Sequence, residues 1–166
     1  MFEIGQQVVY GIHGVCTITG REQEHSAGRT TEYLVLEPLK QAGSRFLVPT
    51  HNGAAMSRLK PMLTREELEQ LLASGDVHTS AWISEEGQRK QHYRELINSG
   101  DRVQLMAMVH TLYQHKRQQL ALGRKVHLCD ENFLRDAEKL LASELSVVMD
   151  METDAAKTYI RSRLQK

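Results

Sequence analysis

The residues best able to carry chemistry lie together between Ala81 and Arg94. This stretch contains Trp82, the only tryptophan of the chain, followed by Arg89 and Lys90. A flat aromatic side chain beside several cations can stack on nucleic-acid bases while the cations bind phosphate groups. A tryptophan is also commonly buried as the anchor of a helical core. The stretch therefore allows two interpretations, a nucleic-acid contact or a core anchor.

The charges of the chain are unevenly placed. Its 21 Lys and Arg balance its 21 Asp and Glu, but residues 87–125 hold eight cations against two acids, a net charge of +6. The flanking segments are acidic. A concentrated basic segment can present a cationic face that a neutral total conceals, although scattered charges on a solvated helix surface would give the same composition. The eight cations are Arg89, Lys90, Arg94, Arg102, Lys116, Arg117, Arg124 and Lys125.

Histidine and cysteine supply the candidate metal ligands. The spacing of His110, His115, His127 and Cys129 does not place four ligands on one helix face, and the sequence has no His-Glu-x-x-His motif. A phosphate-binding loop, a nucleophile elbow and paired cysteines are also missing from the sequence. His13, in a glycine-flanked turn, is expected to make local backbone contacts. We therefore expect no cofactor, no small-molecule substrate and no enzymatic activity. A metal-dependent enzyme that uses these histidines is the weaker alternative.

The first sixty residues alternate apolar and polar side chains with a period of two, interrupted by turns that contain glycine. Their Val, Ile, Tyr and Thr content suits a pleated sheet. Several short antiparallel strands in so short a segment predict a small, strongly bent barrel of the SH3 or Tudor kind, usually a binding platform. The predicted strands are 6–10, 15–22, 31–37 and 45–49, with a short fifth strand at 56–59.

The pattern changes to a period of 3.6 after Lys60-Pro61, where proline disfavours helix in the preceding residue. This predicts two domains, residues 1–60 and 61–166, the second a compact α-helical bundle of five helices. The fold class is therefore α+β. One helix is expected from about Ser84 to Asn98, ended by Ser99-Gly100. The expected caps of the other helices are Thr64 in a capping box, Asp101, Asp130 and Thr153.

Targeting signals are not evident. The sequence lacks a run of eighteen apolar residues and a charged-then-apolar leader, so we expect a soluble protein without membrane association. Cys16 and Cys129 are lone thiols, which is typical of a reduced, cytoplasmic protein.

The opening residues form a specific pattern: Phe2-Glu3-Ile4-Gly5, Val8-Val9-Tyr10 and His13-Gly14, then Glu32-Tyr33-Leu34-Val35-Leu36 and Val48-Pro49. The pattern resembles the amino-terminal domain of the CarD/CdnL family of bacterial transcription regulators, a domain type that also occurs in the transcription-repair coupling factor. Gly11 stands where the family commonly has proline. The resemblance implies docking on the β subunit of RNA polymerase, in part by strand addition at a sheet edge. The residues that this chain offers to the polymerase are Arg21, Glu24, Arg29, Arg45 and Leu47.

The order of elements after Trp82 resembles the carboxy-terminal domain of the same family. A basic helix leads to Ser99-Gly100, and a long helix, a basic turn and a leucine-rich helix follow. The resemblance implies a nucleoid-associated protein that contacts promoter DNA at the upstream edge of the transcription bubble and stabilises the open complex, with Trp82 as a minor-groove wedge. The interval from Trp82 to Ser99 is a few residues longer than in better-known members. The alternative is a protein-interaction adaptor without a DNA wedge, in which Trp82 is a core residue. The residues expected to bind DNA are Trp82, Arg89, Lys90, Arg94, Arg124 and Lys125.

Overall fold

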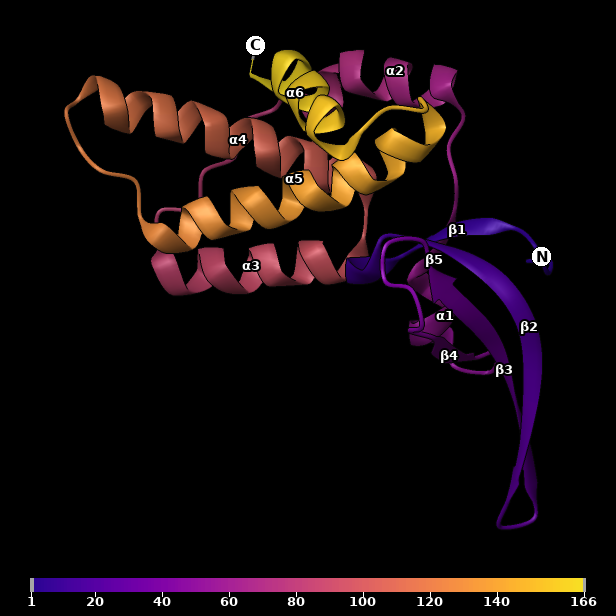
Figure 1. The fold of residues 1–166 in the computed structure, drawn as a ribbon. Coiled ribbons are helices and arrows are strands. Elements are labelled where there is room, and N and C mark those ends of the chain that lie inside the picture. Colours follow the sequence, from indigo (N-terminus) through magenta and orange to yellow (C-terminus); the bar gives the residue numbers. More distant parts are fainter. Residues whose placement is uncertain (1, 166) are drawn as a thin grey trace. The chain divides into compact units, whose positions relative to one another are not determined.

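The computed structural model describes residues 2–165, which form two compact units (Figure 1). The first unit ends at Met62 and the second begins at Leu63. Each unit has its own hydrophobic core. No helix within residues 2–165 is long and apolar enough to cross a membrane.

The first unit is a five-stranded antiparallel sheet with the strand order β4-β3-β2-β1-β5. Its core is formed by Val8, Ile18, Leu36 and their neighbours on the same face. The two outermost strands, β4 and β5, are not paired with each other, so the sheet is bent but not closed into a barrel. The strands are β1 (Gln7–Tyr10), β2 (Val15–Ser26), β3 (Arg29–Pro38), β4 (Phe46–Pro49) and β5 (Leu59–Pro61), with a 3-10 turn at Gly11–His13.

The prediction of a strand at residues 56–59 is mostly wrong. A short helix, α1 (Gly53–Ser57), occupies this segment, and β5 begins only at Leu59. The cause is local: the side chain of Asn52 accepts a hydrogen bond from the backbone N–H of Ala55 at 3.1 Å, which caps a helical turn.

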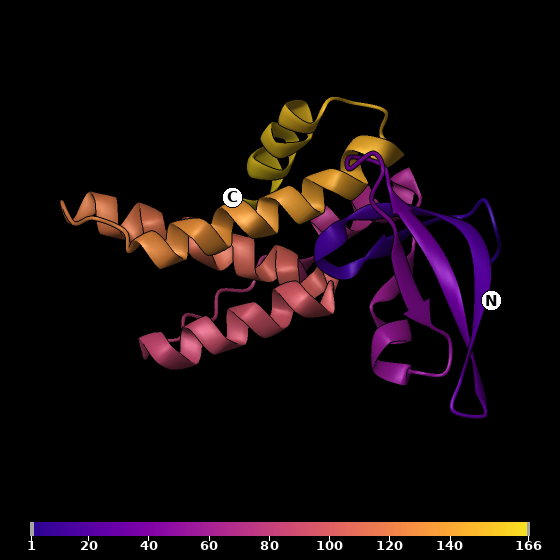
Figure 2. The same cartoon turned by 60° about the horizontal axis from the view of Figure 1, so that its bottom comes forward.

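Strands β2 and β3 are longer than expected and form a hairpin arm. Ala27 (φ 51°) and Gly28 (φ 77°) form its two-residue turn, and these left-handed angles match the twist of the flanking strands. Residues 21–30 are all exposed. Figure 1 shows the arm running beyond the other strands, and Figure 2 shows it from another side.

The second unit is the expected bundle of helices. The capping box of Thr64 and Glu67 is confirmed at the start of α2, and so is Asp101 as the N-cap of α4. Gly100 (φ 67°) ends α3 in the left-handed conformation, as predicted. The helices are α2 (Arg65–Ala73), α3 (Glu86–Ser99), α4 (Arg102–Ala121), α5 (Leu128–Val148) and α6 (Thr153–Leu164), with a 3-10 turn at Gly75–Val77.

Helix α3 begins at Glu86 and not at Ser84. Glu85 is its N-cap, and the carboxylate of Glu85 accepts hydrogen bonds from the backbone N–H groups of Gly87 (3.0 Å) and Gln88 (2.6 Å). A glutamate can therefore close the first turn where a serine was expected to begin the helix.

Two other predicted caps are wrong. The N-cap of α5 is His127, so Asp130 lies inside the first turn, where its carboxylate is paired with Arg89. The N-cap of α6 is Glu152, and Thr153 is the first residue of that helix. In both cases the helix begins earlier than the sequence pattern indicated.

Buried ion pairs tie the helices together. Arg102 at the start of α4 donates two hydrogen bonds of 2.6 Å to Glu144 of α5, whose side chain is 5% exposed. Glu138, one and a half turns earlier in α5, accepts hydrogen bonds from Arg161 of α6 and from the hydroxyl of Tyr113. Arg102 was counted among the cations of the basic segment, but the structure places it against a buried acid.

Candidate nucleic-acid interface

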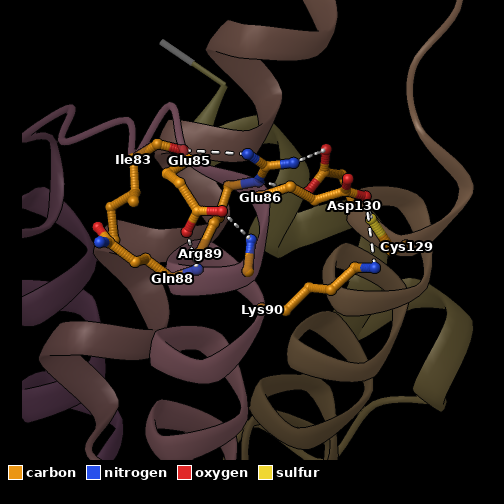
Figure 3. Close-up of polar contacts among 9 residues, drawn as sticks. Ile83, Glu85, Glu86, Gln88, Arg89, Lys90, Cys129 and Asp130 are labelled. Atoms are coloured by element: carbon orange, nitrogen blue, oxygen red, sulfur yellow. Dashed lines mark hydrogen bonds and ion pairs between the residues drawn. The ribbon is translucent and has the colours of Figure 1, made fainter.

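Helices α3 and α5 begin side by side, as Figure 3 shows. The thiol of Cys129 donates a hydrogen bond of 3.6 Å to Glu86, and the guanidinium of Arg89 reaches Asp130. In Figures 1 and 2, α5 lies between α3 and α6. Because residues 122–127 lead directly into α5, the structure brings this basic connection to the end of the bundle where α3 starts.

Arg89 is a buried residue and not a surface cation. Its Nε and Nη2 donate hydrogen bonds of 2.9 and 3.2 Å to the two oxygens of Asp130, and its Nη1 donates one of 3.0 Å to the carbonyl of Ile83 (Figure 3). The side chains of Arg89 and Asp130 are only 3% and 1% exposed. The expected phosphate contact of Arg89 does not fit this position, because its donors are already directed at protein acceptors.

Trp82 is held in a stack at the edge of the helical core. Its ring lies 3.5 Å from the ring of His115, with an angle of 11° between the planes, and the Cζ of Arg89 lies 4.4 Å from the indole centroid. The side chain is neither fully buried nor fully exposed, and it packs against the core of the second unit. The indole is therefore anchored against the core, and one part of it reaches solvent.

His115 completes the stack as a neutral ring. Burial lowers its pKa below the ordinary value of 6.5, and the charges of Arg89 and His127 lower the pKa further, while Asp130 raises it. A neutral imidazole can lie flat against an indole beside a guanidinium without electrostatic cost. In the sequence, His115 was only a candidate metal ligand, because no local pattern indicates its stacking on Trp82. Residues 2–165 contain no group of three or more His, Cys, Asp or Glu that could hold a metal ion.

The other cations expected to bind DNA lie on α3 and in the connection between α4 and α5. Glu86, Lys90 and Arg94 follow each other at intervals of four residues on α3 and so share one face of the helix. Lys90 lies 3.4 Å from Glu86, whose pKa it lowers, and Arg94 is exposed. Arg124 and Lys125 are exposed in the connection between α4 and α5. Of the six residues expected to bind DNA, these four retain accessible charge.

Apolar side chains are exposed around the same basic connection. Leu120, Leu122 and Leu128 are 60%, 64% and 71% exposed. Large apolar side chains beside cations are unusual on a solvated surface and are used as wedges by proteins that bind the minor groove. The sequence pattern gave no indication of these exposed leucines.

The residues expected to face the polymerase do not share one face of the sheet in the first unit. Leu47 pairs with Val35 and is 46% exposed on the side away from the core. Glu24 accepts a hydrogen bond of 3.3 Å from the hydroxyl of Tyr33, which lies on the same side as Val35.

The three arginines of this set are placed differently. Arg45 is paired with Glu22, and Arg29 follows the turn at the tip of the hairpin arm. Arg21 is opposite Leu34 in the ladder, hence on the other face, where it is paired with Glu32 at 2.9 Å. A partner that covers only the outer face of the sheet could therefore not contact all five of these residues.

Comparison with known families matches both units. Residues 2–60 match the CarD-like/TRCF RID domain, and residues 67–161 match the C-terminal domain of CarD. The chain belongs to the CarD family. Members of this family are transcription regulators that bind RNA polymerase through the β subunit and are not enzymes. The chain matches none of the curated proteins.

The buried pair in the CarD C-terminal domain yields a stability prediction. Asp130→Ala should destabilise the helical unit by about 3–5 kcal/mol, because the guanidinium of Arg89 would stay buried without a counter-ion. Chemical denaturation followed by circular dichroism measures this change. The control is Glu69→Ala, which removes the acid of the exposed pair with Arg65 and should cost at most about 1 kcal/mol. Equal costs for the two variants would contradict a structural role for Asp130.

The stack yields a pH prediction. The folded pKa of His115 is lowered, so its contribution to stability is fully present above pH 6.5 and is lost as the pH falls through the folded pKa. The fluorescence of the single tryptophan should therefore titrate with a midpoint below 6.5. His115→Phe should abolish this titration, whereas His92→Gln, at an exposed histidine of α3, should leave it intact. A midpoint at or above 6.5, or a titration that survives His115→Phe, would refute the assignment.

Proposed function

We propose that this CarD-family protein docks on the β subunit of RNA polymerase through its first unit and contacts promoter DNA with the helical unit at the upstream edge of the transcription bubble. There it stabilises the open complex. The observation that carries the proposal is the partly exposed indole of Trp82, which is held by the ring of His115 and the guanidinium of Arg89 just before the helix that carries Lys90 and Arg94.

A fixed aromatic ring can favour the melted state by a simple thermodynamic route. Bases at the edge of a bubble are already partly unstacked, so a side chain inserted there meets a low unstacking cost. Stacking of a base on an aromatic side chain contributes about 1–3 kcal/mol, which is roughly five- to 150-fold in an equilibrium constant. Because this gain exists only when the duplex is open, it shifts the population toward the open complex.

The support around Trp82 suits this role. The bidentate pair of Arg89 and Asp130 holds the guanidinium over the indole, so the ring loses little conformational freedom when it meets a base. Arg89 is thus reassigned in the proposal from a phosphate contact to a positioning residue. The phosphate contacts fall to Lys90, Arg94, Arg124 and Lys125.

The high exposure of two leucines makes them a second candidate for the wedge. Leu122 and Leu128 flank Arg124 and Lys125 and are more exposed than any other large apolar residue described in the chain. Apolar side chains of this size also separate base steps in minor-groove complexes. If they do so here, Trp82 is a core anchor, and the α4–α5 connection is the part that enters the groove.

For the first unit, we propose that the polymerase adds a strand beside β4. This strand lies at an edge of the sheet, and Pro49 at its end is a residue that edge strands accommodate. Leu47 provides an exposed apolar side chain beside that edge. Main-chain pairing would then supply affinity, and the outward side chains would supply specificity.

The test for the helical unit is the lifetime of the open complex with Trp82→Ala, which should shorten it by roughly five- to 150-fold relative to the wild type. The matched control is Tyr159→Ala, because Tyr159 is also a partly buried aromatic residue under an arginine, with the Cζ of Arg163 4.7 Å from its ring. Circular dichroism would verify that both variants fold. If Trp82→Ala binds polymerase and stabilises the open complex as well as the wild type does, Trp82 is not the wedge.

The test for the first unit is a pull-down of RNA polymerase by Leu47→Asp. A charge beside the β4 edge should weaken binding at least about tenfold, because it would have to be desolvated in the interface. Leu39→Asp is the control, since Leu39 has nearly the same exposure, 45% against 46%, but lies outside the strands. Equal capture by both variants would exclude the β4 edge as the docking surface.

A further inference from the structure

A basic hollow of about 720 Å³ is lined by residues of α4, α5 and α6. Helix α6 lies on the side of α5 away from α3 (Figures 1 and 2). Trp82, His115 and Arg89, which form the stack, are not among the residues that line the hollow. Its lining contains two acids, Glu131 and Glu138, against five cations. The cations are Lys116 and Arg117 of α4, Arg135 of α5, and Lys157 and Arg161 of α6.

The acid at the bottom of the hollow is neutralised within the protein. Glu138 is only 4% exposed and accepts hydrogen bonds from the hydroxyl of Tyr113 and from Nη2 of Arg161, the latter at 2.9 Å. Burial and the neighbouring Glu138 raise the pKa of Tyr113, so its phenol remains a neutral donor. Glu138 therefore fixes Arg161 in place without presenting negative charge to a ligand.

The four other cations keep most of their binding capacity. Arg117 donates to the carbonyl of Gln165, and Arg135 donates to the side chain of Asn132; both acceptors are neutral. Lys116 and Lys157 are partly exposed. Only Glu131 among the lining residues offers an exposed negative charge. The hollow is thus positive although the whole chain has no net charge.

The position of the hollow indicates an extended anion. Lys116 and Arg117 lie near the end of α4, the exposed Arg124 and Lys125 follow in the connection to α5, and Arg135 lies two turns after the start of α5. Positive charge therefore continues from the hollow around the end of the α4–α5 hairpin. An open hollow with charged walls does not match the enclosed, mostly apolar pockets that hold small molecules. Spaced phosphates along a strand match it better.

We propose that this hollow is a second binding site for DNA phosphates, which takes the backbone of the promoter duplex on the α6 side of the hairpin. The inference rests on the proposed function, since it assumes that the helical unit meets promoter DNA. The proposed contact is independent of Trp82, and it involves the DNA backbone without recognition of base sequence. The helical unit would then hold the duplex at two places along α5.

The experiment measures the affinity of the protein for a preformed complex of polymerase and promoter at several salt concentrations, and in parallel for polymerase without DNA. The variant is Lys116→Gln combined with Lys157→Gln. The control is Arg65→Gln combined with Lys139→Gln, which removes the same charge at exposed positions outside the hollow. Arg135→Gln provides a second variant, and circular dichroism verifies folding.

The loss of two phosphate contacts should reduce the slope of log affinity against log salt by about 1.8. The wild-type affinity for the DNA complex should then fall roughly tenfold more than that of the variant between about 50 and 200 mM salt. The control should behave like the wild type. On polymerase without DNA, the wild type, both hollow variants and the control should bind equally.

Three results would overturn the proposal. An unchanged slope for both hollow variants would remove the hollow from the DNA interface, and the role of Trp82 would then stand on its own test. A weaker affinity of the hollow variants for polymerase without DNA would assign the hollow to a protein partner. A wild-type slope that is the same with and without DNA would exclude any DNA contact, and the proposed function would fail with it.

Discussion

The buried ion pair of Arg89 and Asp130 is the interaction on which the end of the helical unit depends. Both charges are almost completely removed from water, which costs several kcal/mol per ion unless the geometry restores the lost hydrogen bonds. Two parallel hydrogen bonds to Asp130 and a third to the carbonyl of Ile83 do so. The main effect of the pair is therefore on the arrangement of the elements and less on net stability. It fixes where α3 meets α5 and where the segment that carries Trp82 enters α3.

The elements could be predicted from local pattern, but the pairing between elements could not. The capping box of Thr64 and the glycine at position 100 each reflect forces within one or two turns, and the structure bears them out. Asp130 looked like a helix cap because an aspartate before an apolar run usually is one. Its partner lies 41 residues away, and no local periodicity reports such a contact.

One signal for Arg89 was available in the sequence. Arg89, Tyr93 and Leu96 are spaced by four and three residues, so they belong to the same stripe of α3, and the structure buries all three. Counting charge along the chain ignored this spacing and treated every cation as surface. The same count included Arg102, which is bound to Glu144. A cation on the apolar stripe of a helix therefore predicts a buried acidic partner on another element.

This separation of cations changes the physical picture of the proposed DNA contact. With Arg89 and Arg102 committed to buried acids, the accessible positive charge is smaller than the sequence indicated and is divided between the α3 side and the α6 side of α5. A weak, divided surface would bind free DNA poorly. Attachment to the polymerase through the first unit raises the local concentration of the site, so weak binding is sufficient there. Low intrinsic affinity would also keep the protein from binding DNA away from polymerase, where counterion release alone would otherwise hold a strongly basic domain.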